Sequence, residues 1–506
     1  MSLRPAAGSR PWYRRAFGLG LALAALPAAA QVSGPLTGQS LFFNQASNAH
    51  IGNYLAVNAG LLYTSNAQFA ANGTGDTLAT LGLIGDVARE GTRLDYHLDS
   101  DVALLKYLSG SFGTQFTGYL DGEAALKIVP GFFSWIARET YTQLQIDPYT
   151  PATPANLENL NYITTGPRFM LRPTLRTSVT LDGLYSYVSS SSSAPQFVNL
   201  DSNRYGGNLT VDRAFSETSS LYIKGSYQKV DFKDQVDNNN FSIADAEGGF
   251  RLHGGRTDFN VSGGYSRIQV EDVLVPVDTI LGTVERPETQ TFSGAIWSFN
   301  LSRLITPSNR VSLYANQQFT DPAAGFRLGF DQPVPVIAPT QFAAGNPYQS
   351  RDYGADWRFE TLRTSIDVSF LAARVRYVVN NANTDTSDHN AKVASVLFAR
   401  QLSPVLNWDV GGMYSHTDFS NVQPSISNGQ TTVKVTTALT DLRWRVGERV
   451  SLRFLYAYTA QLGIHANQVG ITASYALTGG GQPGTTESQT PLLQPTSPQS
   501  MQPQRY

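Results

Sequence analysis

Asp95, His97 and Asp99 occupy every second position of one short segment, with apolar or aromatic residues between them. Alternate side chains of a β-strand point to the same face, so these three groups could together bind a cation. A hydrogen-bonded histidine on a polar strand face explains the same spacing, and the six histidines of the chain form no His-Glu-x-x-His pair. We therefore predict no metal site and no bound cofactor.

Other reactive side chains lack a setting that would activate them. The 506 residues include no cysteine, which excludes thiolate nucleophiles and thiolate metal sites. Serine is abundant, but no serine stands in the strand-turn-helix pattern of a nucleophile elbow. Gly206-Gly207 and Gly254-Gly255 precede no helical pattern, so neither pair predicts a phosphate-binding loop. We expect a protein that is not an enzyme.

Charged and polar side chains instead recur at alternate positions of many segments. Tyr119, Asp121 and Glu123 share one face of their segment, while Phe116 and Leu120 share the other. A charged group facing lipid is costly, by about 2–4 kcal/mol for Arg or Lys at mid-depth, so the polar face suits a wet interior. Simple solvation and ion pairing of that interior is the alternative for each residue. The residues predicted to line a pore are Arg93, Asp95, Asp99, Asp101, Tyr119, Asp121, Glu123, Arg168, Arg172, Arg176, Arg204, Asp212, Tyr222, Lys224, Arg443, Arg445 and Arg453.

Residues 204–232 show the element that would position such side chains. Two alternating runs flank a short polar turn at residues 216–219, and Tyr205, Leu209 and Val211 share one face of the first run. A period of two predicts strands. Each run is long enough to cross a bilayer as a tilted strand, which needs roughly 9–11 residues. We interpret the unit as a hairpin of a transmembrane barrel, with a soluble sandwich hairpin as the alternative.

The unit recurs along the whole chain, and its connections alternate between short and long. Bacterial outer-membrane barrels have short periplasmic turns, longer external loops and an even strand number. We therefore predict an all-β fold, a transmembrane antiparallel up-and-down barrel of about 20 strands (18 to 22) over residues 52–477, with both termini in the periplasm. The strands are expected to begin near residues 53, 77, 92, 112, 133, 159, 175, 197, 220, 240, 257, 291, 309, 351, 364, 389, 406, 432, 450 and 466.

Three segments depart from the simple repeat. Gly166-Pro167 interrupts one run, and a proline removes a ladder donor, so we expect a β-bulge there. Residues 272–288 are predicted to form an external loop. Residues 321–350 contain five prolines and form a loop long enough to be functional or mobile. Both an inward-folded constriction and an ordinary surface loop are compatible with that sequence.

The ends of the chain and its composition indicate the compartment. Residues 1–30 resemble a secretory signal peptide, with arginines before an apolar run and a small-residue cleavage site. Residues 31–51 are a short periplasmic lead-in, too short for a plug domain, and residues 478–506 form a disordered tail rich in Pro, Gln and Ser. No other apolar stretch reaches the roughly 18 residues of a membrane helix. With a net charge of −2, nothing suggests a nucleic-acid partner, and we expect the Gram-negative outer membrane.

Several motifs point to a known family. They are IDPYTPATPAN at residues 146–156, Asn161-Tyr162, Thr165-Gly166-Pro167 and DSNRYG at residues 201–206, together with residues 58–66. The chain resembles, over roughly residues 50–477, outer-membrane β-barrel proteins that accompany exopolysaccharide-synthesis and PEP-CTERM (exosortase) loci in proteobacteria. The resemblance implies a role in polysaccharide export or cell-surface assembly and implies no catalytic residues. The serine run at residues 189–193 and the tail are not features of that family.

The function expected from these observations is passive export of a hydrophilic polymer. We predict a conduit for an exopolysaccharide, handed over by a periplasmic polysaccharide-export protein, in a barrel that the barrel-assembly machinery inserts among outer-membrane lipids. Tyr119 and Tyr222 could stack on sugar rings. A general small-solute porin and a non-transporting structural barrel are the alternatives. The sequence does not decide the polymer, the oligomeric state or whether residues 321–350 close the lumen.

Overall fold

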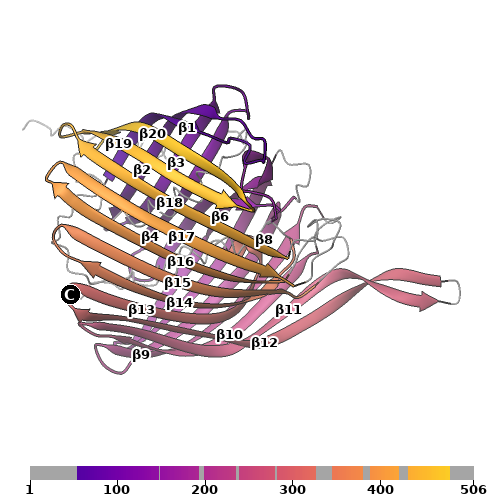
Figure 1. Cartoon of the computed structure of the whole chain (residues 1–506). Helices are drawn as coiled ribbons and strands as arrows, with labels where there is room; N and C mark the ends of the chain where they lie inside the picture. The colour runs from indigo at the N-terminus through magenta and orange to yellow at the C-terminus, as the bar shows by residue number, and fades with distance from the viewer. Residues whose placement is uncertain are drawn as a thin grey trace, which may run out of the picture. The chain divides into compact units, whose positions relative to one another are not determined.

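A computed structural model of the chain contains a single closed sheet of 20 antiparallel strands (Figure 1). It describes residues 54–147, 149–192, 199–234, 239–279, 282–325, 345–379, 388–420 and 431–478. The predicted signal peptide, the lead-in and the tail from residue 479 lie outside the described residues. Among the described residues, no helix has the length and apolar character needed to cross a membrane.

Every strand pairs with its neighbours in sequence, and β1 pairs with β20 to close the barrel. The strands of the first half are β1 (Tyr54–Thr64), β2 (Asp76–Arg89), β3 (Leu94–Tyr107), β4 (Gln115–Val129), β5 (Phe133–Gln145), β6 (Leu157–Thr174), β7 (Thr177–Ser191), β8 (Ser202–Ala214), β9 (Ser219–Phe232) and β10 (Phe241–His253). Those of the second half are β11 (Thr257–Thr279), β12 (Gly282–Thr306), β13 (Asn309–Thr320), β14 (Tyr348–Glu360), β15 (Thr364–Tyr377), β16 (His389–Ser403), β17 (Leu406–Phe419), β18 (Thr432–Arg445), β19 (Val450–Gln461) and β20 (Ile464–Ala476). A short 3₁₀ helix, η1 (Pro154–Asn156), precedes β6.

The predicted fold class is confirmed, and most predicted strand starts lie within three residues of the observed ones. One rim of the barrel carries the short turns, such as residues 175–176 and 307–308, and we call it the periplasmic rim. The other rim carries the longer connections, such as residues 65–75 and 321–347, and we call it the outer rim. β1 begins and β20 ends at the periplasmic rim, as an even strand number requires.

The alternation of side chains determines which residues face outwards. On β8 and β9, Tyr205, Leu209 and Ile223 are exposed, and Ile223 has an exposed fraction of 69%. Arg204 and Tyr222, at neighbouring positions of the opposite parity, are buried. The apolar side chains thus face the surroundings and the polar ones the interior, the reverse of a soluble protein and the pattern of a membrane barrel.

The predicted loop at residues 272–288 is wrong. β11 and β12 continue as a two-stranded ribbon that projects beyond the barrel (Figure 1), with Val273 opposite Glu288 and Thr279 opposite Gly282. The register shifts between Val270 and Val273, where Asp272 has a φ of 57°. A two-stranded ribbon has two free edges, so a proline can be accommodated in it at a position where no ladder donor is needed.

The predicted bulge at Gly166-Pro167 is also wrong. β6 keeps one register with β5 across this pair, and its register with β7 is the same on both sides of it. Glycine allows a close approach instead, because a Cβ on Gly166 would lie 1.9 Å from the carbonyl oxygen of Gly183. Pro167 has no backbone N–H for the ladder, but β6 continues past it without an extra residue.

Candidate functional site

The inner wall of the barrel carries paired charges near the periplasmic rim, and we call these the lumen ion pairs. They come mostly from neighbouring strands, because cross-strand side chains of one face lie about 4.5–5.5 Å apart. The pairs are Asp86–His97 (3.3 Å), Asp95–Lys127 (2.7 Å), Asp121–Arg138 (3.2 Å), Arg168–Asp182 (2.8 Å), Asp212–Arg251 (3.2 Å), Lys224–Glu247 (3.3 Å), Asp409–Arg443 and Asp441–Arg453 (2.9 Å). Opposite charges therefore alternate around much of this wall.

The three groups of the predicted cation-binding motif contact three different neighbours. Asp95 pairs with Lys127, His97 with Asp86, and Asp99 accepts a hydrogen bond of 3.0 Å from the Tyr119 hydroxyl. Among the described residues, no group of three or more His, Cys, Asp or Glu side chains could hold a metal ion. Since each group is already engaged, the structure gives the motif no metal geometry.

Two tyrosines predicted to line the pore are held firmly in the wall. Tyr119 is fully buried and donates to Asp99. The Tyr222 ring lies under the Arg251 guanidinium at 4.0 Å, and its hydroxyl is 3.3 Å from Asn260. Both rings face inwards, but Tyr119 is 0% exposed and Tyr222 5% exposed. The wall covers both rings almost completely, so the prediction that they stack on sugar rings is wrong.

The remaining predicted pore residues divide between wall and rim. Asp101, Glu123, Asp212 and Lys224 have the inward parity of their strands and are at most partly exposed. The prediction that Arg93 and Arg176 line the pore wall is wrong, because both lie in short turns of the periplasmic rim and are exposed. Their runs of alternation extend beyond the last ladder pair, so the pattern alone placed them in strands. Arg172 and Arg445 lie at strand ends near the same rim, where Arg445 donates to the carbonyl of Pro404.

The inner wall changes character towards the outer rim, which the sequence analysis did not anticipate. An apolar cluster forms there from β5 to β11 and from residues of the outer connections. The inward faces of these strands are charged near the periplasmic rim. Near the outer rim the same faces carry apolar residues such as Val230, Phe241 and Ile268. The outward faces there carry polar residues such as Lys229, Asp231 and Gln269. This exchange of polar and apolar faces along one strand is the sequence signal that was missed. The buried cluster is Leu144, Leu160, Tyr162, Val188, Leu200, Val230, Phe232, Phe241, Ile243, Ile268, Val270, Val273, Ala323 and Val379.

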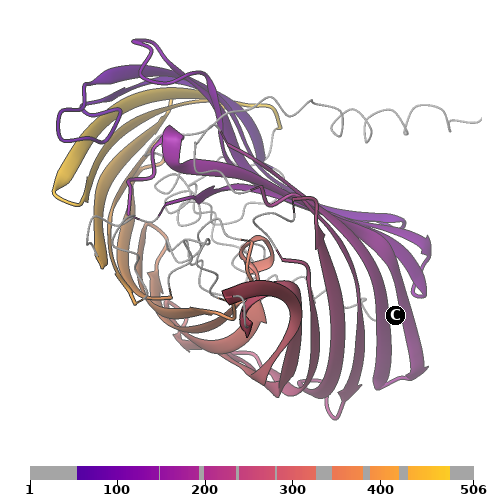
Figure 2. The ribbon, with the colours of Figure 1, turned by 90° about the vertical axis from the view of Figure 1, so that its right-hand side faces the viewer.

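Ala323 belongs to this cluster because the chain turns inwards after β13. Residues 322–325 form one helical turn that lies within the ring of strands (Figure 2). Asp321 caps the turn, since its Oδ2 accepts from the Ala323 backbone N–H at 3.2 Å, and Pro322 follows at the first helical position. The start of the predicted 321–350 loop therefore folds into the lumen.

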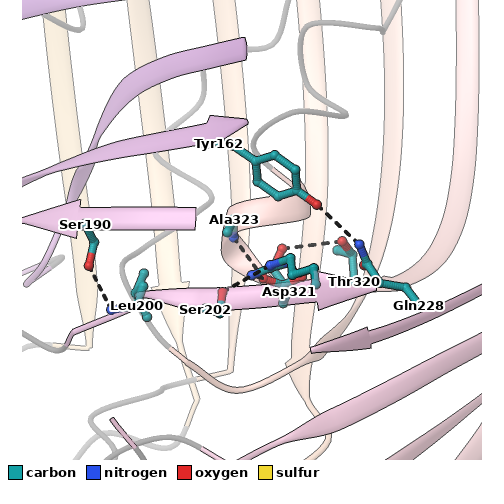
Figure 3. A network of polar contacts seen from close by, with 9 residues as sticks. Tyr162, Ser190, Leu200, Ser202, Gln228, Thr320, Asp321 and Ala323 are labelled. Carbon is teal, nitrogen blue, oxygen red and sulfur yellow. Dashed lines mark hydrogen bonds and ion pairs between the residues drawn. The ribbon is translucent and has the colours of Figure 1, made fainter. Parts of the chain in front are cut away.

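An ion pair holds this turn against β8 of the wall, and we call it the Arg204–Asp321 anchor. Arg204 on β8 donates from Nη1 and Nη2 to the two oxygens of Asp321, each at 2.8 Å. The two side chains are 1% and 2% exposed. Arg204 also donates to Ser202 Oγ at 3.2 Å, and its guanidinium lies 5.2 Å from the Tyr162 ring centroid. Figure 3 shows Asp321 between Ser202, Tyr162 and Ala323.

The outer surface carries an apolar belt bounded by aromatic residues. Trp135, Trp357, Trp408 and Trp444 are exposed near the periplasmic rim, and exposed tyrosines such as Tyr353 lie nearer the outer rim. Girdles of aromatic residues at both interfaces around an apolar band are the pattern of outer-membrane barrels. The protein is an outer-membrane β-barrel. It crosses the membrane with all twenty described strands.

Comparison with known proteins assigns this chain to no family. The sequence matches no protein-family model, and no curated protein matches it. Among solved structures, the siderophore receptor PirA from Acinetobacter baumannii has a TM-score of 0.45 and 10% identity, covering 85% of this chain and 81% of the receptor. The FrpB iron transporter from Neisseria meningitidis (F5-1 variant) has a TM-score of 0.44 and 9% identity over 85% and 84% of the two chains. The ferric yersiniabactin uptake receptor FyuA from Yersinia pestis has a TM-score of 0.40 and 11% identity over 85% and 81%. Because these TM-scores lie below 0.5, the description of the fold rests on the strand pairing alone.

Proposed function

We propose that this barrel is an outer-membrane conduit for a hydrophilic polymer, with an exopolysaccharide as its cargo. The observation that carries the proposal is the inner wall near the periplasmic rim, where lumen ion pairs recur from strand to strand. A polymer that moves must bind weakly at many similar sites. Partly exposed paired charges, such as Lys224 and Glu247, offer hydrogen bonds of that kind to sugar hydroxyls without holding any one sugar tightly.

The periplasmic rim supports the handover part of the proposal. Exposed arginines stand in five of its short turns, namely Arg93, Arg176, Arg256, Arg363 and Arg449. Such a rim attracts an acidic surface or an anionic chain, because charges of one sign raise the local concentration of the other. We propose that a periplasmic polysaccharide-export protein docks at this rim.

The filled lumen near the outer rim supports a second candidate function, that of a structural barrel. The Arg204–Asp321 anchor and the apolar cluster place protein inside the lumen on the side of β5 to β11. A structural barrel that transports nothing would tolerate such filling. In a conduit the same segment narrows the path and selects an extended chain over a compact solute.

The test compares inward and outward ion pairs in a strain that lacks the chromosomal gene. Complementation uses wild type, a Lys224→Gln/Glu247→Gln variant that removes one lumen ion pair and, as the matched control, a Lys229→Gln/Asp231→Asn variant that removes an outward-facing pair. We expect deletion to abolish surface polysaccharide, the inward variant to restore it poorly and the control to restore it fully.

Proteoliposome swelling separates the alternatives. Rapid swelling in small sugars by the wild-type barrel supports a general porin and overturns the polymer proposal. Unchanged surface polysaccharide in the deletion strain, together with no swelling, supports the structural barrel.

A further inference from the structure

A cluster of cations lies on the lipid-facing surface near the outer rim, independent of the lumen and of the proposed function. It spans the five consecutive strands β14 to β18, which run side by side in Figure 1. Its members have the outward parity of their strands. They are Arg351, Arg374, Arg376, Lys392, His416 and Lys434, and we call them the outer basic cluster.

The aromatic girdle places this cluster at a definite depth. On β14, Tyr353 is an exposed, lipid-facing ring, and Arg351 lies two residues nearer the outer rim on the same face. On β17, Tyr414 and His416 have the same relationship. Rings of tyrosine mark the boundary between hydrocarbon and headgroups, so the cations just beyond them lie among the headgroups of the outer leaflet.

The strand register brings like charges together. Arg351 is directly opposite Arg374, and Lys392 and Lys434 lie opposite His416 from its two sides. Side chains directly opposite each other have Cβ atoms about 4.5–5.5 Å apart, and like charges there are destabilising. A bound anion between the strands would remove that repulsion.

The chain itself neutralises only part of the cluster. Arg376 lies 3.5 Å from Asp388, and His416 lies 2.9 Å from Asp418. Arg351, Arg374 and Lys392, like Lys434, have no carboxylate partner among the described residues. At the same level of the described strands elsewhere, outward cations are scattered, and Lys229 on β9 is paired with Asp231 at 3.0 Å.

A cavity beside the cluster adds neutral hydrogen-bonding groups. It has a volume of about 540 Å³, and its lining includes His416, Thr432, Lys434 and Thr436. The Thr432 hydroxyl donates to Asp418 Oδ1 at 3.0 Å, and His416 contacts the same oxygen, so the Lys434 ammonium and the Thr436 hydroxyl remain for a ligand. These donors match the acceptor oxygens of a phosphate, which forms charge-assisted hydrogen bonds with an ammonium group.

We propose that the outer basic cluster binds the phosphate groups of an anionic lipid in the outer leaflet. The depth selects a lipid rather than a soluble anion, because the acyl chains of the lipid pack on the apolar belt directly below. Basic pockets on membrane proteins bind anionic headgroups by the same attraction.

The experiment measures binding of diphosphoryl lipid A to the full chain in detergent by native mass spectrometry. The test variant is Arg374→Gln/Lys392→Gln, and the matched control is Lys106→Gln/Arg267→Gln, which removes the same charge from other outward positions near the outer rim. We expect at least tenfold weaker binding in the test variant and no change in the control. We also expect wild type to bind lipid A stripped of phosphate at least tenfold more weakly.

Folding of each variant is checked by heat-modifiable migration in gels, and lipid-free stability provides a second readout. The test variant should resist urea at least as well as wild type without lipid, because the substitution relieves repulsion. Added lipid A should raise the urea midpoint of wild type and of the control variant, and much less that of the test variant.

Three results would overturn the proposal. The first is equal weakening in test and control variants, which would mean nonspecific attraction. The second is equal binding of phosphorylated and dephosphorylated lipid. The third is displacement of lipid A by 10 mM inorganic phosphate, which would assign the cluster to a soluble anion.

Discussion

Removing the charge of Asp321 should release the inward turn from the lumen wall without unfolding the barrel. The Asp321→Asn variant keeps the shape of the side chain but leaves the Arg204 guanidinium buried and uncompensated. Breaking a buried ion pair in this way costs about 3–5 kcal/mol. The Arg204–Asp321 anchor is nearly inaccessible to solvent and makes two bonds of 2.8 Å, so the full range applies.

The cost should appear as local opening, because the twenty-strand ladder does not depend on this contact. At about 1.4 kcal/mol per factor of ten, the equilibrium for opening should rise roughly a hundredfold to several thousandfold. Within the turn, the Gly325 backbone N–H donates to the Asp321 carbonyl oxygen at 2.7 Å. Hydrogen–deuterium exchange of the Gly325 amide, followed by mass spectrometry, therefore reports the opening, because a protected amide exchanges through the locally open state.

Two further variants make the measurement decisive. Asp231→Asn breaks the exposed Lys229–Asp231 pair, whose side chains are 39% and 34% exposed. Exposed pairs contribute only about 0–1 kcal/mol, so the Gly325 amide should exchange at the wild-type rate. The double variant Arg204→Met/Asp321→Leu removes both charges, and its Gly325 amide should exchange more slowly than in Asp321→Asn, because no buried charge is left unpaired. A wild-type exchange rate in Asp321→Asn would refute the role given to this ion pair.

Two other substitutions test the membrane orientation and the close packing of the wall. Leu209→Arg, on the lipid face near mid-depth, should destabilise the barrel by about 2–4 kcal/mol in urea titrations in lipid vesicles, whereas Asn208→Arg, facing the lumen, should cost less than 1 kcal/mol; equal costs would contradict the assigned faces. Gly166→Ala should destabilise by about 1–3 kcal/mol, because its Cβ would meet the Gly183 carbonyl oxygen at 1.9 Å. Gly183→Ala, whose nearest contact is Pro167 Cγ at 3.6 Å, should lower the urea midpoint much less, and the reverse order would show that the two strands are not held so closely.

The local pattern of residues was sufficient to predict the architecture. A strand that separates lipid from a polar interior must alternate, so Tyr205, Leu209 and Val211 identified a lipid face before any coordinates were considered. Turn residues then bounded the strands, and the alternation of short and long connections identified the two rims. These signals are local, because a period of two can be recognised within one strand without reference to the rest of the chain.

Contacts between distant residues could not be predicted in this way. Nothing in the sequence joins Arg204 to Asp321, which are 117 positions apart, because the inward path of the connection depends on how the barrel curves around it. The outer basic cluster likewise exists only through the register of five strands, which places Arg351 opposite Arg374. Periodicity assigns a side chain to a face, whereas closure and register decide which side chains meet there.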